Sequence, residues 1–230
     1  MKNKLLLFCL ILYNCNGDSD SVISESVWDI DKQGIPQFVS TNYIELDKIA
    51  QISKFRSSVG HDYSDAFEHC RSMKHYFKPF DDIVWSTVNI YSPIDGIITR
   101  IEQEIYGTKI EIESKQYPAF RFQLFHLTPD HEIKINDEVA AGEYVGKHAS
   151  QDTYADISVI VNDPSKQGRF ISWFDVVTNT LFEAYKDRGA ISRNDFIISK
   201  ELRDAYPLDC NNFGFNDPLE KWFNLNERLR

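Results

Sequence analysis

The stretch IYSPIDGIITRIEQEIYGTKIEIES, residues 90–114, decides the fold. Apolar and polar side chains alternate along it, with Ile97 on one side of Gly107 and Ile110 and Ile112 on the other. A period of two is typical of a strand with one buried face, and glycine marks a turn between strands. The stretch therefore predicts two adjacent β-strands joined at Gly107.

Further strands are expected on the C-terminal side of this pair. AFRFQLFHL, residues 119–127, places Phe120, Phe122 and Leu124 on one face and Arg121, Gln123 and Phe125 on the other. TYADISVIV, residues 153–161, has the composition of a last strand. Short strands at regular spacing predict a mainly β protein whose core is a β-sandwich or rolled sheet.

Helical spacing appears in the flanking segments. SDAFEHCRSMKHYF, residues 64–77, and ISWFDVVTNTLFEAYKDRG, residues 171–189, both repeat apolar side chains every three to four positions. Gly189 suits a helix C-terminus, and Ser199 suits the start of a shorter helix. We therefore expect flanking and C-terminal helices around the β core.

Composition limits the possible partners. The 230 residues include 42% hydrophobic side chains, which is ordinary for a globular protein, and the formal charge is −10. Phosphate backbones and acidic lipid headgroups repel such a chain, so nucleic acid is not an expected partner.

The N-terminus predicts export. MKNKLLLFCLILYNC, residues 1–15, has two lysines, an apolar run too short to span a bilayer, and a closing Cys15. This pattern resembles a signal peptide with a lipobox, in which Cys15 carries the lipid and is the sole membrane attachment. Residues 16–40 then form a polar tether. Plain secretion and a cytosolic chain with an unusual N-terminus are the alternatives.

Two cysteines, Cys70 and Cys210, remain after such a signal peptide and its Cys9 are removed. In an oxidising compartment they are expected to form one disulfide. Two unrelated buried thiols are the alternative.

Three phrases carry a family resemblance: Ser92-Pro93-Ile94-Asp95-Gly96-Ile97, Phe125-His126-Leu127, and the hairpin from Val139 to Gly146. Their order resembles the lysostaphin-type zinc endopeptidases, which have the duplicated-hybrid-motif fold. The resemblance implies a peptidase-like β domain over residues 41–165. Residues 166–230 are then a helical C-terminal extension packed on it.

The resemblance also implies a site. His61 and Asp65 match the H-x-x-x-D zinc ligands of the family. Its H-x-H phrase is replaced by Tyr154-Ala155-Asp156, so Asp156 becomes the third zinc ligand, and His126 and Tyr154 take the catalytic positions. Three protein ligands leave one zinc position for water.

Each of these residues also has a structural interpretation. His61 can hydrogen-bond Asp65 without a metal, and Asp65 can be the N-cap of the following helix. His126 can be a structural histidine, and Asp156 an exposed strand residue. Replacing an imidazole ligand by the carboxylate of Asp156 makes the metal-bound water less acidic. Replacing the catalytic histidine by Tyr154 removes the better proton acceptor. Both replacements weaken metal-assisted hydrolysis.

Three functions follow as hypotheses for a protein of the bacterial cell envelope. The first is a metallopeptidase that hydrolyses peptidoglycan cross-link peptides with one zinc ion. The second is an inactive descendant that binds a wall peptide, a glycan or an envelope protein. The third is a purely structural lipoprotein domain.

Overall fold

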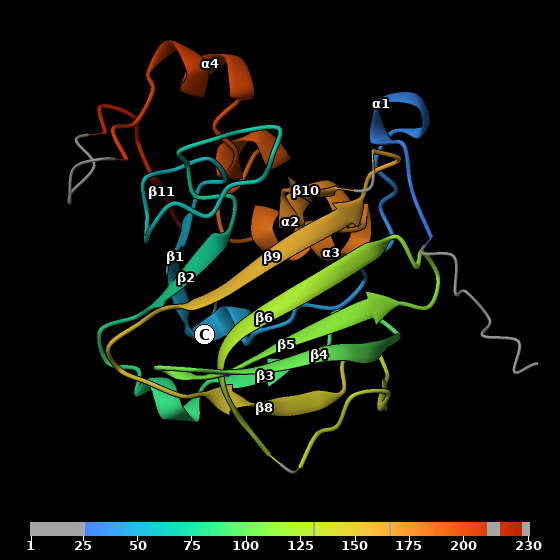
Figure 1. The fold of residues 1–230 in the computed structure, drawn as a ribbon. Helices are drawn as coiled ribbons and strands as arrows, with labels where there is room; N and C mark the ends of the chain where they lie inside the picture. The colour runs from blue at the N-terminus through green and yellow to red at the C-terminus, as the bar shows by residue number, and fades with distance from the viewer. Residues whose placement is uncertain (1–25, 131, 166, 211–216, 227–230) are drawn as a thin grey trace, which may run out of the picture.

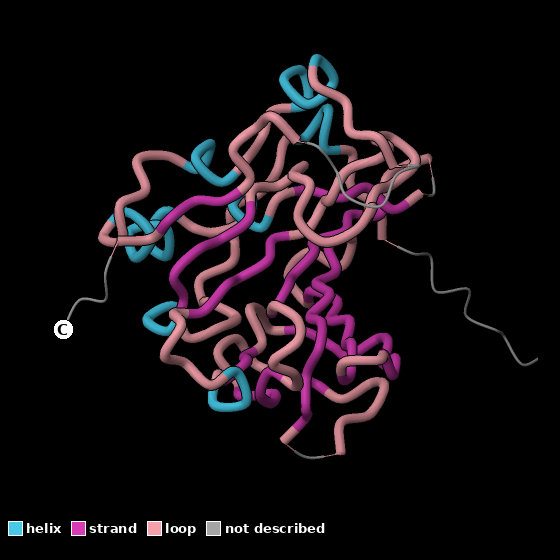
Figure 2. Tube along the Cα trace, turned by 90° about the vertical axis from the view of Figure 1, so that its left-hand side faces the viewer, coloured by secondary structure: helices cyan, strands magenta, loops and turns pink. Residues whose placement is uncertain are grey.

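A computed structural model describes residues 26–130, 132–165, 167–210 and 217–226. The predicted signal peptide with Cys15, and the first part of the predicted tether, lie outside the described residues. The helices are short and lie around the strands (Figure 2). They are α1 (Ile30–Gln33), α2 (Trp173–Val176), α3 (Asn179–Lys186), α4 (Lys200–Ala205) and the 3-10 turns Leu46–Lys48, Trp85–Thr87 and Arg193–Phe196.

The strands form a single antiparallel sheet, which confirms the mainly β prediction (Figure 1). Its main path runs β11-β1-β2-β9-β6-β5-β4-β7, while β10 pairs with β9 and β8 joins β3 to β6. The bounds are β1 (Ile49–Ser53), β2 (His75–Pro79), β3 (Asn89–Tyr91), β4 (Gly96–Glu104), β5 (Gly107–Ser114), β6 (Phe120–Pro129), β7 (Glu138–Val139), β8 (Tyr144–His148), β9 (Ala155–Asn162), β10 (Gly168–Ile171) and β11 (Trp222–Asn224).

The strands predicted from residues 90–114 are β4 and β5, and they pair as expected across Gly107. Ile98 lies opposite Ile112, and both side chains are fully buried. One face of the sheet is therefore the hydrophobic core, to which the neighbouring strands contribute further buried side chains: Phe120, Phe122, Leu124, Ala155, Ile157, Val159 and Val161.

The helix predicted over residues 64–77 is wrong. The segment contains a turn at Asp65 and then enters β2, whose Phe77 pairs with Ala155 of β9. Cys70 has a backbone φ of 57°, which no α-helix accommodates. Pairing with the sheet has therefore overridden the apolar spacing that suggested a helix.

The C-terminal helices are largely as expected. Residues 171–189 form α2 and α3, separated by extended backbone at Val177 and Thr178, and α4 begins after Ser199, whose hydroxyl caps the backbone N–H of Leu202. The same region also adds β10 and β11 to the sheet. None of the helices in the described ranges has the length and apolar character needed to cross a membrane.

The C-terminal end of the predicted tether, at residues 38–39, packs against the sheet. The ring of Phe38 lies 4.7 Å from that of Tyr117 and 5.5 Å from that of Phe120, and Val39 is fully buried.

The disulfide between Cys70 and Cys210 is present, with the two Cα atoms 5.6 Å apart. Cys70 belongs to the long connection between β1 and β2. We call this connection, residues 54–74, the cover segment, because it lies over the face of the sheet opposite the core. In Figure 1 it runs beside α4, near β11.

Candidate functional site

The face of the sheet under the cover segment is polar. Glu111 of β5 lies opposite Gln123 of β6, and Gln123 lies opposite Ser158 of β9. Residues directly opposite one another share a face of the sheet, so these three side chains form a row. All three are buried. We call this surface the polar face.

A β-bulge brings His126 to the polar face. The pairing of β5 with β6 passes from Ile110↔Leu124 to Thr108↔Leu127, so two residues of β6 oppose one residue of β5. His126 has a φ of 59°, uncommon outside glycine. Bulges redirect side chains in this way and often occur near functional sites. Phe125 and His126 therefore both leave the core, while Leu127 returns to it.

Asp156 is fully buried on the same face and is paired with a lysine from the cover segment. The Nζ atom of Lys74 lies 2.8 Å from Oδ2 of Asp156, and the side chain of Lys74 is 3% exposed. Burying either charge alone is costly, and the two offset each other. Lys74 is therefore the direct counter-charge of Asp156.

Aromatic rings surround the same ammonium group. Nζ of Lys74 lies 3.5 Å from the ring centroid of Phe125, 4.0 Å from that of Tyr63 and 5.8 Å from that of Tyr76. The negative faces of aromatic rings attract cations, most strongly where water is excluded. One carboxylate and three rings thus hold a single cation.

His126 lies between two carboxylates. Its Nε2 atom is 3.3 Å from Oδ1 of Asp156, and its Nδ1 atom is 3.3 Å from Oε2 of Glu104. Both contacts are close enough for ion pairs with a protonated imidazole, but their angles do not satisfy hydrogen-bond geometry. The ring of His148 is 6.2 Å from that of His126, and burial lowers the pKa of His148 to about 4.

The row of polar residues also binds the cover segment. The hydroxyl group of Tyr63 donates a hydrogen bond of 2.6 Å to Oε1 of Gln123, which also accepts one from Ser158. The amide of Gln123 donates to Glu111 at 2.8 Å. Burial and the nearby carboxylates raise the pKa of Tyr63, so its hydroxyl stays a donor.

Ion pairs hold the cover segment at its outer side. Arg56 binds Glu68 through two nitrogen atoms at 2.6 and 2.7 Å, and Arg71 binds Glu68 at 2.7 Å. Arg71 also reaches Asp204 of α4 at 2.8 Å. The pairs with Glu68 brace the cover segment internally, while the Arg71–Asp204 pair and the disulfide attach it to the C-terminal region.

The structure brings together two of the predicted site residues, His126 and Asp156. His61 is exposed, and its Nδ1 atom contacts the carbonyl oxygen of Asp62 at 2.8 Å. Among the described residues, no hydrogen bond or ion pair joins it to Asp65, His126 or Asp156. Tyr154 precedes β9, and its ring packs on Trp222 at 5.6 Å.

Asp65 uses both carboxylate oxygens in backbone hydrogen bonds. One oxygen accepts from the N–H groups of Phe67 and Glu68 at 2.8 and 2.9 Å, and the other accepts from Phe170 at 2.7 Å. Asp65 therefore caps a turn rather than the predicted helix, and it also links the cover segment to β10.

Zinc does not fit this set of side chains. The described residues contain no group of three or more His, Cys, Asp or Glu side chains arranged to hold a metal ion. Of the three predicted ligands, Asp156 is paired with Lys74, Asp65 accepts three backbone hydrogen bonds, and His61 contacts neither of them. The assignment of His61, Asp65 and Asp156 as ligands stays a prediction that this geometry does not favour.

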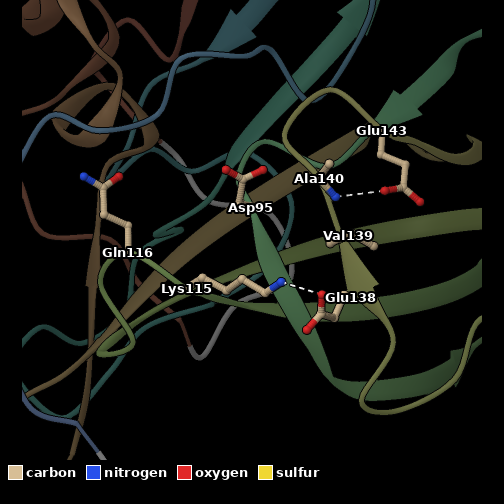
Figure 3. A pocket seen from close by; sticks show the side chains of 7 residues that line it. All are labelled: Asp95, Lys115, Gln116, Glu138, Val139, Ala140 and Glu143. Atoms are coloured by element: carbon tan, nitrogen blue, oxygen red, sulfur yellow. Dashed lines mark hydrogen bonds and ion pairs between the residues drawn. The ribbon is translucent and has the colours of Figure 1, made fainter.

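A separate open depression lies at the edge of the sheet near β7 (Figure 3). Its volume is about 710 Å³, and it is lined by Asp95, Lys115, Gln116, Glu138, Val139, Ala140 and Glu143. Lys115 pairs with Glu138 at 2.7 Å, and Glu143 accepts a hydrogen bond from the backbone of Ala140 at 2.8 Å. None of the predicted site residues lines it.

Sequence reasoning missed Lys74 and Glu104. The signal for Lys74 was present: Lys74 and Tyr76 alternate with His75 and Phe77, as they do in a strand. The interpretation of residues 64–77 as a helix concealed it. Glu104 ends a predicted strand, and no pattern in the sequence places it beside His126.

No protein-family model matches the chain, and no curated protein matches it. Among solved structures, the NMR structure of lysostaphin is 17% identical over 42% of this chain and 39% of its own, with a TM-score of 0.32. Csd3 of Helicobacter pylori is 15% identical over 66% of this chain and 40% of its own, with a TM-score of 0.44. A structure of the SpoIIQ–SpoIIIAH pore-forming complex is 11% identical over 67% of this chain and 98% of its own, also at 0.44.

The chain spans about two fifths of the lengths of lysostaphin and Csd3. With TM-scores below 0.5, these similarities do not assign it to a family.

Proposed function

We propose that the chain is a peptidase-like protein of the bacterial cell envelope that binds a peptide of the wall without hydrolysing it. The ion pair between Lys74 and Asp156 carries this proposal, because it neutralises the carboxylate that the resemblance assigns to zinc. The resemblance around Ser92–Ile97 and Val139–Gly146 supports a peptidase-like origin. The signal-peptide pattern that ends in Cys15 supports export and a lipid anchor.

The open depression in Figure 3 is the surface that suits such a ligand. Its volume is within the usual range for ligand sites, about 300–1,000 Å³. The carboxylates of Asp95, Glu138 and Glu143 match the amino groups of a peptide, and Lys115 matches a carboxylate. Binding there requires no movement of the cover segment.

Sedimentation with purified, insoluble peptidoglycan tests the proposal. The protein should pellet with the wall, release no muropeptides, and behave identically with EDTA or added zinc. Glu138→Gln combined with Glu143→Gln should reduce pelleting. Asp47→Asn with Asp81→Asn, which removes two exposed carboxylates elsewhere, should leave pelleting unchanged. Release of cross-link peptides that depends on zinc would contradict the proposal, as would the absence of wall binding.

A further inference from the structure

The environment of Lys74 suits one chemical group. Its ammonium nitrogen is 2.8 Å from Asp156, and the rings of Phe125 and Tyr63 lie against it at 3.5 and 4.0 Å. These groups come from separate parts of the chain, since Tyr63 belongs to the cover segment, Phe125 to β6 and Asp156 to β9. A carboxylate with facing rings is the arrangement that selects a desolvated organic cation.

The close enclosure of the Lys74 ammonium group favours a primary ammonium ion. Lys74 is 3% exposed and Asp156 is 0% exposed, so the cation has no space for a hydration shell. The planar guanidinium group of arginine is wider and presents five donors, which Asp156 alone does not satisfy. A divalent metal prefers several N, O or S ligands, whereas two of the groups packed against this ammonium are the aromatic rings of Phe125 and Tyr63.

We infer that Tyr63, Phe125 and Asp156 form a cation cage for a primary ammonium ion, and that the chain fills this cage with its own Lys74. The cage locks the cover segment onto the polar face. The resident cation at Asp156 is thus part of the polypeptide rather than a metal. This inference rests on the contacts of Lys74 and does not require wall binding.

Chemical rescue tests the cage. Lys74→Ala removes the three outer methylene groups and the ammonium, which n-propylammonium replaces. The variant should melt about 10 °C below the wild type, because the buried Asp156 loses its lysine counter-charge. Adding n-propylammonium at tens of millimolar should raise its Tm and leave the wild-type Tm unchanged. 1-Propanol, which has a similar shape without the charge, should not act in this way.

Two further variants locate the rescue. Lys74→Ala with Asp156→Asn should lose the response to propylammonium. Lys74→Met, which fills the cage with an uncharged side chain, should also show none. An equal response to propylammonium in all three variants, or an equal response to 1-propanol, would overturn the inference.

NMR of the wild-type protein tests the same inference if Lys74→Ala does not fold. The side-chain NH₃⁺ group of Lys74 should give a signal protected from exchange with water, and its Cε protons should be shifted upfield by the adjacent rings. Phe125→Leu should reduce that shift. A Lys74 signal that exchanges as fast as those of exposed lysines would overturn the cage. Loss of wall binding, or a response of the wild type to zinc, would instead count against the proposed function and leave the cage intact.

Discussion

Lys74 and Asp156 form a buried ion pair whose Nζ and Oδ2 atoms lie 2.8 Å apart. The pair joins the cover segment to β9, a strand in the middle of the sheet. Asp156 is the position at which the family resemblance implies a zinc ligand. The counter-charge that such a site would receive from a metal ion is here supplied by a side chain 82 residues earlier in the chain.

Removing both partners of this pair should cost less stability than the sum of the two single losses. Lys74→Met removes the lysine counter-charge of the buried Asp156, and Asp156→Asn removes the counter-charge of the buried Lys74. Each should lower the free energy of unfolding by about 3–5 kcal/mol. The double variant should lose about 1–3 kcal/mol less than the sum of the single losses. Urea denaturation of the four proteins measures this coupling, and strictly additive losses would contradict a direct pair.

Asp65 separates the structural interpretation from the ligand prediction. Asp65→Ala removes the acceptor for three backbone N–H groups, those of Phe67, Glu68 and Phe170. The free energy of unfolding should fall by about 1–3 kcal/mol. Bound zinc should be equally low in the variant and the wild type, as measured by elemental analysis after purification at neutral pH. If the wild type instead carried stoichiometric zinc and lost it on this substitution, the prediction of Asp65 as a zinc ligand would be supported.

Local patterns predicted the β core because its strands alternate regularly. Ile110 and Ile112 are buried as their spacing indicated, and Phe125 lies on the same polar face as Gln123. In β4 the buried residue is Ile98 rather than the expected Ile97, because a register shift follows Ile98 in its pairing with β5. Alternation would place His126 in the core beside Leu124. A bulge reverses its direction, and bulges depend on pairing between strands that no local pattern encodes.

The cover segment was harder to predict for a different reason. Its conformation depends on partners distant in sequence: Lys74 with Asp156, Tyr63 with Gln123, and Cys70 with Cys210. Helical spacing of apolar residues is only a local preference, and these tertiary contacts outweigh it. The sequence therefore indicated the candidate residues His126 and Asp156 but not Lys74, the lysine of the cover segment that pairs with Asp156.

Acid should destabilise the protein through its buried histidines. Burial lowers the pKa of His75 to about 4, and of His148 to about 4. Unfolded histidine has a pKa near 6.5, so between pH 6.5 and 4 the unfolded state binds more protons than the folded state. The stability contributed by the neutral forms is complete above about pH 6.5 and is lost as the pH falls toward 4. Each histidine should account for about 3 kcal/mol.

Chemical denaturation at pH 7, 6, 5 and 4 measures this loss. His75 is the sharper test, because its Nδ1 atom contacts the carbonyl of Ser53 at 2.8 Å and its Nε2 atom contacts the hydroxyl of Ser172 at 2.8 Å. His75→Gln should be less stable than the wild type at pH 7 but should lose less stability on acidification. Equal slopes for the two proteins would show that His75 is not the group that titrates.

The disulfide should act mainly on the cover segment. Cys70 and Cys210 are 140 residues apart in sequence, so the bond restricts a large loop of the unfolded chain. Its removal by Cys210→Ser should cost about 2–4 kcal/mol. The Arg71–Asp204 ion pair and the buried Lys74–Asp156 pair should keep the segment closed in most molecules. Hydrogen exchange should therefore accelerate more in residues 54–74 than at the amides of β5 and β6, which lose protection only to the extent that the global free energy of unfolding falls. Equal acceleration in both regions would mean that the disulfide stabilises the whole sheet rather than the cover over it.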